Sequence, residues 1–265
     1  MFLRAVLENT PLVADLYYYH WVFTRRPNAY RGIYSSFAEA LKSVPKGKKG
    51  GYSQPEINQS SSVSKFTAAY EIGEFNSLDY PVIFWLKSAL TDSQKIFDIG
   101  GNVGLAYYAY QKYLPYPQNL NWLVCEIPEI VKAGNEIAIQ KNINNLHFTT
   151  DFNKGDGFDI LLTCGALQYI EQSLAEIVSS FSQKPKHILT NHVPFCDNES
   201  FITLQNIVYT FCPYKIQNKF EFVSSLNHLG YELIDTWKIN RNCIIPFHPD
   251  RFVEAYYGFY FRLKT

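Results

Sequence analysis

The sequence has no excess of charge of either sign. Its 265 residues include 24 lysines and arginines and 24 aspartates and glutamates, so the formal net charge is zero. Proteins that bind nucleic acid normally carry a positive field over the binding domain, and we therefore expect no nucleic-acid partner. Apolar residues make up 47% of the chain, which is enough to bury a large core in one domain with or without an appendage.

Cysteine is scarce and is not arranged in pairs. The number of cysteines is odd, and no C-x-x-C pair occurs. This usage argues against a disulfide scaffold and against a zinc site, so we predict no metal and a reducing, cytoplasmic compartment. The five cysteines are Cys125, Cys164, Cys196, Cys212 and Cys243.

Long apolar runs are also missing. No run reaches the length that spans a bilayer, and the apolar stretch at residues 1–9 is interrupted too early for a signal peptide. We therefore expect no integral membrane segment. The aromatic cluster at residues 17–21 is compatible with a membrane surface, but it better fits a helix packed on the main domain or on a partner subunit, and a homo-oligomer is a further expectation.

Residues 95–104, with the sequence KIFDIGGNVG, are the most informative stretch. The pattern predicts a buried strand over residues 95–99, a glycine turn, and a helix from about residue 103 through 113. Such a turn exposes bare backbone and the positive end of a helix to a ligand, although an ordinary turn is the alternative. A dinucleotide fingerprint would need its first glycine at position 99, where the chain has Ile99, and this argues against an NAD-linked enzyme.

A second acid follows the next predicted strand. Residues 122–126 are apolar and end in Glu126, 22 residues after Gly104. A carboxylate at the tip of the second strand is placed to accept hydrogen bonds from both hydroxyls of a ribose. The alternative is that Glu126 caps the helix that begins near Pro128.

The turn and the two acids together resemble motif I and its surroundings in the class I S-adenosylmethionine-dependent methyltransferases. Asn102 stands where that pattern has its middle glycine, and asparagine tolerates positive φ better than other residues with a side chain. The resemblance implies S-adenosylmethionine as cofactor and a Rossmann-like seven-stranded α/β sheet, mostly parallel, with its last strand antiparallel. It also implies cofactor contacts at Asp98, Gly100, Gly101, Asn102, Gly104, Glu126, Asp151 and Gly165.

The resemblance gives these positions different roles. Asp98 and the glycine turn would hold the methionine part of the cofactor, and Glu126 the ribose. Asp151 would contact the adenine amino group, or would equally serve as a loop cap. Gly165 follows the fourth strand, where cofactor and acceptor meet in this family.

The rest of the chain fits the same plan. We predict an N-terminal helical appendage at residues 1–92 and a methyltransferase domain at 93–265, with an insertion at 194–218 whose apolar centre is helix-like. Helices are expected at residues 1–23, from residue 36, from about 68, and at 81–90, 129–141, 170–181 and 220–229. Strands are expected at 95–99, 122–126, 146–150, 158–164, 187–193, 231–239 and 256–263.

The candidate catalytic residues are His192 and Tyr169. His192, at the end of the fifth strand, is the best-placed general base for a hydroxyl acceptor, although a hydrogen-bonded wall residue is the alternative. Tyr169 and Gln168 are candidate acceptor contacts. Residues 51–57, 201–206 and 230–233 resemble a bacterial methyltransferase subfamily found among surface-polysaccharide genes, which suggests a sugar or nucleotide-sugar acceptor. A protein that keeps the fold for binding or assembly without transfer is the other hypothesis.

Overall fold

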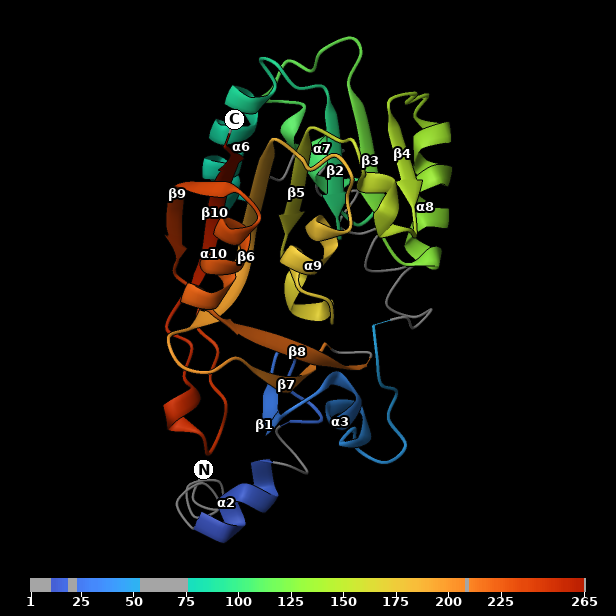
Figure 1. The fold of residues 1–265 in the computed structure, drawn as a ribbon. Helices are drawn as coiled ribbons and strands as arrows, with labels where there is room; N and C mark the ends of the chain where they lie inside the picture. The colour runs from blue at the N-terminus through green and yellow to red at the C-terminus, as the bar shows by residue number, and fades with distance from the viewer. Residues whose placement is uncertain (1–10, 19–22, 53–75, 208–209, 265) are drawn as a thin grey trace.

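The fold is built on a seven-stranded sheet. It is seen in a computed structural model, which describes residues 11–18, 23–52, 76–207 and 210–264. Six strands run parallel, and β10 lies antiparallel between β6 and β9 (Figure 1). This arrangement confirms the predicted fold class. In spatial order the strands are β4 (Leu146–Thr149), β3 (Asn121–Cys125), β2 (Lys95–Ile99), β5 (Ile160–Cys164), β6 (His187–Cys196), β10 (Tyr256–Leu263) and β9 (Tyr231–Ile239).

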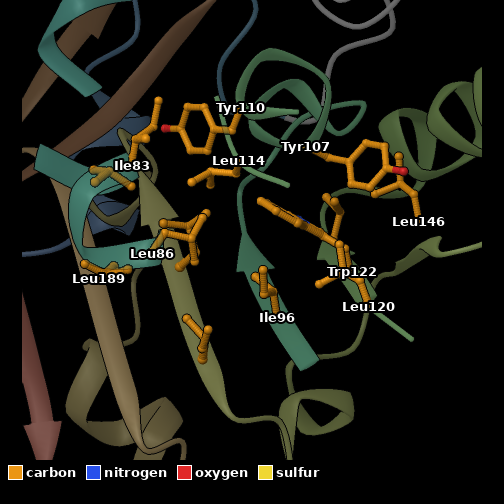
Figure 2. Packing of buried hydrophobic residues seen from close by; sticks show 14 of the residues in the cluster. Ile83, Leu86, Ile96, Tyr107, Tyr110, Leu114, Leu120, Trp122, Leu146 and Leu189 are labelled. Atoms are coloured by element: carbon orange, nitrogen blue, oxygen red, sulfur yellow. The ribbon is translucent and has the colours of Figure 1, made fainter. Parts of the chain in front are cut away.

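Helices cover both faces of this sheet because side chains alternate along each buried strand. Ile96 packs in the core that includes residues of α6 (Tyr80–Ala89), α7 (Leu105–Tyr110) and α8 (Pro128–Gln140). Phe97, its neighbour in sequence, packs in the core formed with α9 (Leu174–Ser179) and α10 (Lys219–His228). Trp122 is the largest fully buried side chain and lies in the first of these cores beside Leu120 and Ile96 (Figure 2).

A second, three-stranded antiparallel sheet stands at the carboxyl ends of the parallel strands (Figure 1). It consists of β1 (Tyr30–Tyr34), β7 (Phe201–Asn206) and β8 (Phe211–Asn218). The end of β6 joins the two sheets, because Phe195 and Cys196 pair with β8. α3 (Phe37–Lys42) packs beside it, and α2 (Pro11–Tyr17) lies farthest from the seven-stranded sheet (Figure 1).

This second sheet corrects one expectation and adds a strand that was not predicted. The centre of the 194–218 insertion is not helix-like: β7 and β8 pair with each other, and β7 also pairs with β1, which was not predicted. A short apolar run fits a strand or a buried helix equally well, and the pairing that decides between them comes from residues 30–34, far away in sequence. The division of the chain at residue 92 stays a prediction.

Two helices begin later than expected, one because of left-handed backbone and one because of a capping serine. α7 begins at Leu105 and not at residue 103, because Asn102 and Gly104 have φ values of 55° and 89°. α9 begins only after Ser173, which forms a capping box with Glu176. Of the helix expected at residues 1–23, the structure describes residues 11–18 and 23 and shows α2 at Pro11–Tyr17. The remainder of that helix and the helix expected from about residue 68 lie outside the described residues. Short 3-10 helices are η3 (Ser77–Asp79), η4 (Phe152–Gly155), η5 (Leu167–Tyr169) and η6 (Pro249–Arg251).

The described helices are too short or too polar to cross a bilayer.

Candidate functional site

A cavity of about 440 Å³ opens at the carboxyl ends of the central parallel strands. Its walls come from the turns after β2, β3, β4 and β5, together with Tyr52 from the N-terminal segment. Ligand pockets in proteins measure about 300–1,000 Å³, so this space suits a molecule of nucleoside size. Open parallel sheets bind their ligands at this edge, where the strand order reverses between β2 and β5.

The glycine turn brings its backbone close to the neighbouring turn. Gly100 has φ 73° and its N–H donates to the Cys125 carbonyl at 2.9 Å. A Cβ atom at Gly100 would overlap the Cβ of Ala166, which follows β5. Only glycine therefore fits at this position without moving one turn.

Asn102 occupies a left-handed position in the turn. Its φ of 55° is left-handed, and its side-chain Oδ1 accepts a hydrogen bond from the Val103 N–H at 2.9 Å. This local hydrogen bond is one reason that asparagine tolerates the left-handed region. Gly104, at φ 89°, then serves as the N-cap of α7, and a side chain there would press on Leu146 at 2.8 Å.

Glu126 lies on the cavity wall and is held by backbone on two sides. Its Oε1 accepts from the Asn102 N–H at 3.3 Å, and its Oε2 accepts from the Ile127 N–H at 3.0 Å. The carboxylate thereby links the turn after β2 to the turn after β3. Next to it, Ile127, Pro128 and Phe152 line an apolar part of the cavity.

Asp98 does not line the cavity. It is 1% exposed, and its Oδ2 accepts from the Trp122 indole N–H at 3.1 Å. Burial raises the pKa of Asp98 from its ordinary 3.8 to about 7, against the lowering effect of the Trp122 hydrogen bond. A Cβ at Gly101 would overlap this carboxylate, so Asp98 lies directly beneath the turn. Its contact with a methionine group stays a prediction.

Asp151 is exposed and caps η4, where its Oδ1 accepts from the Asn153 N–H at 2.9 Å. Its neighbours Thr150 and Phe152 line the cavity, and Asp151 does not. The loop-cap interpretation therefore describes what this carboxylate does in the structure, and the adenine contact stays a prediction.

Tyr169 forms the far wall of the cavity with Gly165 and Ile170. Its hydroxyl donates to Gln205 Oε1 at 2.7 Å, and burial raises the pKa of the phenol above its ordinary value. A phenol in this state is neutral at physiological pH and is a poor proton acceptor. Gln168 is buried, and its Nε2 donates to the Gly165 carbonyl at 2.8 Å.

His192 lies directly behind Gly165, where a Cβ added to the glycine would stand 3.6 Å from the His192 Cβ. Its φ of 57° is left-handed, and the pairing of β6 with β10 shifts register at this point. The His192 Nε2 lies 3.0 Å from Asp79 Oδ1, and both side chains are about 15% exposed, at 14% and 15%. Asn191 Nδ2 donates to the same oxygen at 2.8 Å.

Of the residues chosen from the sequence, the cavity is lined by Gly100, Glu126, Gly165 and Tyr169. Gly101, Asn102 and Gly104 belong to the turn but do not line the cavity. Tyr52 and Phe152, which also line the cavity, and Asp79, which contacts His192, were not predicted. Asp79 stands 113 residues before His192 in the chain, so no local pattern connects them. Phe152, directly after Asp151 at the end of the third parallel strand, lines the cavity. Within the described ranges, no group of three or more His, Cys, Asp or Glu side chains could hold a metal ion.

Comparison with known proteins shows a likeness of fold. No protein-family model and no curated protein sequence matches the chain. A Clostridium acetobutylicum S-adenosylmethionine-dependent methyltransferase superposes with a TM-score of 0.49 and 9% identity, over 77% of this chain and 99% of that one. The Burkholderia thailandensis 1,6-didemethyltoxoflavin-N1-methyltransferase with bound S-adenosylhomocysteine gives 0.48 and 16%, over 81% and 92%.

The Synechocystis magnesium protoporphyrin IX methyltransferase with bound S-adenosylhomocysteine gives a TM-score of 0.49 and 12% identity, over 79% of this chain and 97% of that one. Scores and identities of this size describe a loose similarity, and the fold itself follows from the strand order given above. In structure, the chain resembles the class I S-adenosylmethionine-dependent methyltransferases.

Proposed function

We propose that this protein transfers a methyl group from S-adenosylmethionine to a small acceptor. The observation that carries the proposal is Glu126, whose carboxylate is fixed by the backbone of both adjoining turns and lies on the cavity wall. A fixed carboxylate at the tip of the second strand is suited to accept hydrogen bonds from ribose hydroxyls.

The residues around Glu126 fit the remaining parts of the cofactor. The Gly100 turn, which has no room for a Cβ, offers bare backbone to the methionine part. Ile127, Pro128 and Phe152 form an apolar slot for the adenine ring. When bound, the cofactor supplies an electrophilic methyl group on a sulfonium leaving group. The protein's main contribution is then to hold the acceptor in line, since positioning supplies much of the rate.

His192 is the candidate base, and Asp79 is its positioning partner. The His192 Nε2 faces both Asp79 Oδ1 at 3.0 Å and Asn76 Nδ2 at 3.1 Å. The proposed mechanism uses the tautomer in which Nε2–H donates to Asp79, because that tautomer leaves a lone pair on Nδ1. His192 does not itself line the cavity but stands behind Gly165, which has no side chain. In the proposed scheme, His192 takes the proton of an acceptor hydroxyl at Nδ1, and Asp79 stabilises the imidazolium that forms. Tyr169 does not serve as the base in this scheme, because its hydroxyl is committed to Gln205 and burial raises its pKa.

The proposed acceptor atom is an oxygen, because a histidine base is useful for a hydroxyl. We further propose that this hydroxyl belongs to a sugar or a nucleotide-sugar and that the pathway builds a surface polysaccharide. The support for this is the sequence resemblance at residues 51–57, 201–206 and 230–233. We place the enzyme in the cytoplasm, and a homo-oligomer remains part of the proposal.

Calorimetric titration with S-adenosylhomocysteine tests the cofactor. Glu126→Gln should weaken binding about 10- to 100-fold, the worth of hydrogen bonds to a charged group. Glu136→Gln, on the exposed side of α8, is the matched control and should bind like the wild type. A folded wild-type protein that does not bind S-adenosylhomocysteine would refute the proposal. Binding without turnover of any acceptor in a cell extract would favour a binding or assembly protein.

A further inference from the structure

One part of the cavity wall is formed by two aromatic rings. Tyr52 and Tyr169 both line the cavity, with ring centroids 5.3 Å apart and an interplanar angle of 40°. Tyr52 comes from the N-terminal segment and Tyr169 from η5, so the two rings meet only in the folded protein. A pair of tilted rings of this kind offers flat apolar faces to a ligand.

Tyr169 is fixed in place by a buried chain of hydrogen bonds that reaches into the second sheet. Its hydroxyl donates to Gln205 Oε1 at 2.7 Å, and Gln205 Nε2 donates to the Tyr30 hydroxyl at 3.1 Å. The Tyr30 hydroxyl lies 3.2 Å from that of Tyr256, and the Tyr214 ring packs edge-on against Tyr169 at 5.2 Å. With its polar tip engaged, Tyr169 presents a ring to the cavity and not a hydroxyl.

The charge of the lining residues limits what the cavity can hold. Among the described residues that line the cavity, Glu126 is the only one with a charged side chain, and none is lysine, arginine or histidine. Arg241 lies over the Tyr256 ring at 4.9 Å and does not line the cavity. The methionine part of the cofactor carries its own ammonium group beside its carboxylate. A phosphate or carboxylate that brings no cation of its own would lose its hydration beside Glu126 and find no cationic partner among the described lining residues, which is costly.

Building on the proposed methyl transfer, we propose that the acceptor is an uncharged ring compound that stacks on Tyr52 and Tyr169. A phenol and a neutral sugar both offer a hydroxyl on a ring with a flat face, so they are two sources of the same chemistry. A nucleotide-sugar would have to keep its phosphates outside the cavity.

Ligand-observed NMR on the full-length protein, with and without S-adenosylhomocysteine, tests this with matched pairs of probes. The aromatic pair is catechol and 3,4-dihydroxybenzoate, and the sugar pair is methyl glucoside and glucose 6-phosphate. We expect the neutral member of one pair to bind, and its anionic partner to bind at least about tenfold more weakly because its charge is buried unpaired. The pair that responds identifies the source.

Variants locate the binding. Tyr169→Leu should weaken the neutral probe about three- to tenfold, the worth of an aromatic contact, whereas Tyr169→Phe keeps the ring and should stay within about threefold of the wild type. Tyr113→Leu removes a tyrosine that is 37% exposed and serves as the control. Three results would overturn the inference. Anionic probes could bind as tightly as neutral ones, neither kind of probe could bind, or Tyr169→Leu could bind the neutral probe as tightly as the wild type does. If neutral rings bind but S-adenosylhomocysteine does not, methyl transfer fails and the ring site stands.

Discussion

Gly100→Ala should destabilise the protein through two separable effects. The first is backbone strain, because an alanine at φ 73° is in the left-handed region, which costs about 1–2 kcal/mol. The second is overlap of the new Cβ with the Cβ of Ala166, and overpacking of this kind costs about 1–3 kcal/mol. Together they should lower the free energy of unfolding by about 2–5 kcal/mol, measured by urea denaturation.

Gly47→Ala is the matched control, because Gly47 has φ 76° and no atom within 4 Å of an added Cβ. It should show the strain alone, about 1–2 kcal/mol. Adding Ala166→Gly to Gly100→Ala removes the methyl group that overlaps the new Cβ. The double variant should therefore recover part of the unfolding free energy by which Gly100→Ala falls below Gly47→Ala, so the two substitutions should not be additive. Equal destabilisation by Gly100→Ala and Gly47→Ala, or no recovery in the double variant, would show that the two turns are not in the close contact described here.

Three further outcomes are expected. The pKa of Asp98 is raised from 3.8 to about 7 in the folded protein, so its contribution to stability is present below pH 3.8 and is lost as the pH rises toward 7. Asp98→Asn cannot ionise and escapes this loss. Between pH 4 and pH 8, the difference in unfolding free energy between Asp98→Asn and the wild type should therefore rise by up to about 4 kcal/mol in favour of the variant, measured by urea denaturation at each pH. His192→Gln should lower kcat about 100-fold or more, and Asp79→Asn should lower it by a smaller factor. Both variants should bind S-adenosylhomocysteine as the wild type does. If Asp79→Asn has the same kcat as the wild type, Asp79 is not the positioning partner. Burial raises the pKa of the Cys125 thiol to about 12, so iodoacetamide at pH 8 should leave Cys125 unlabelled in the folded protein, as peptide mass spectrometry can check.

The parts of the fold that depend on neighbouring residues were predictable from the sequence. β2, β9 and β10 have the expected bounds, since buried strands between turn residues leave a local pattern. The left-handed turn was also predictable, because Asn102 and the glycines around it are the residues that tolerate positive φ. Glu126 follows from the same logic, as it directly ends a strand next to the one that carries the turn.

The parts that depend on distant pairing were not predictable. β1 becomes a strand only because it pairs with β7, and the two are more than 160 residues apart in the chain. Asp79 likewise meets His192 only through the packing of η3 against β6. No residue near Asp79 in sequence marks it as a partner for a histidine, because helix signals and hydrophobic periodicity describe local backbone and not tertiary contacts.

The length of β6 explains why His192 lies where it does. The strand was expected to end at residue 193 but continues to Cys196, pairing first with β5 and β10 and then with β8 of the second sheet. A strand shared by two sheets must change direction, and a bulge supplies that change by adding a residue to one side of the pairing. His192 is the residue added by the bulge. Its positive φ costs about 1–3 kcal/mol. Hydrogen bonds that join Asn191 and His192 to Asp79 help to hold this conformation. The bulge therefore joins the two sheets and at the same time places an imidazole behind Gly165, so the position of the candidate base is a consequence of how the second sheet is attached to the first.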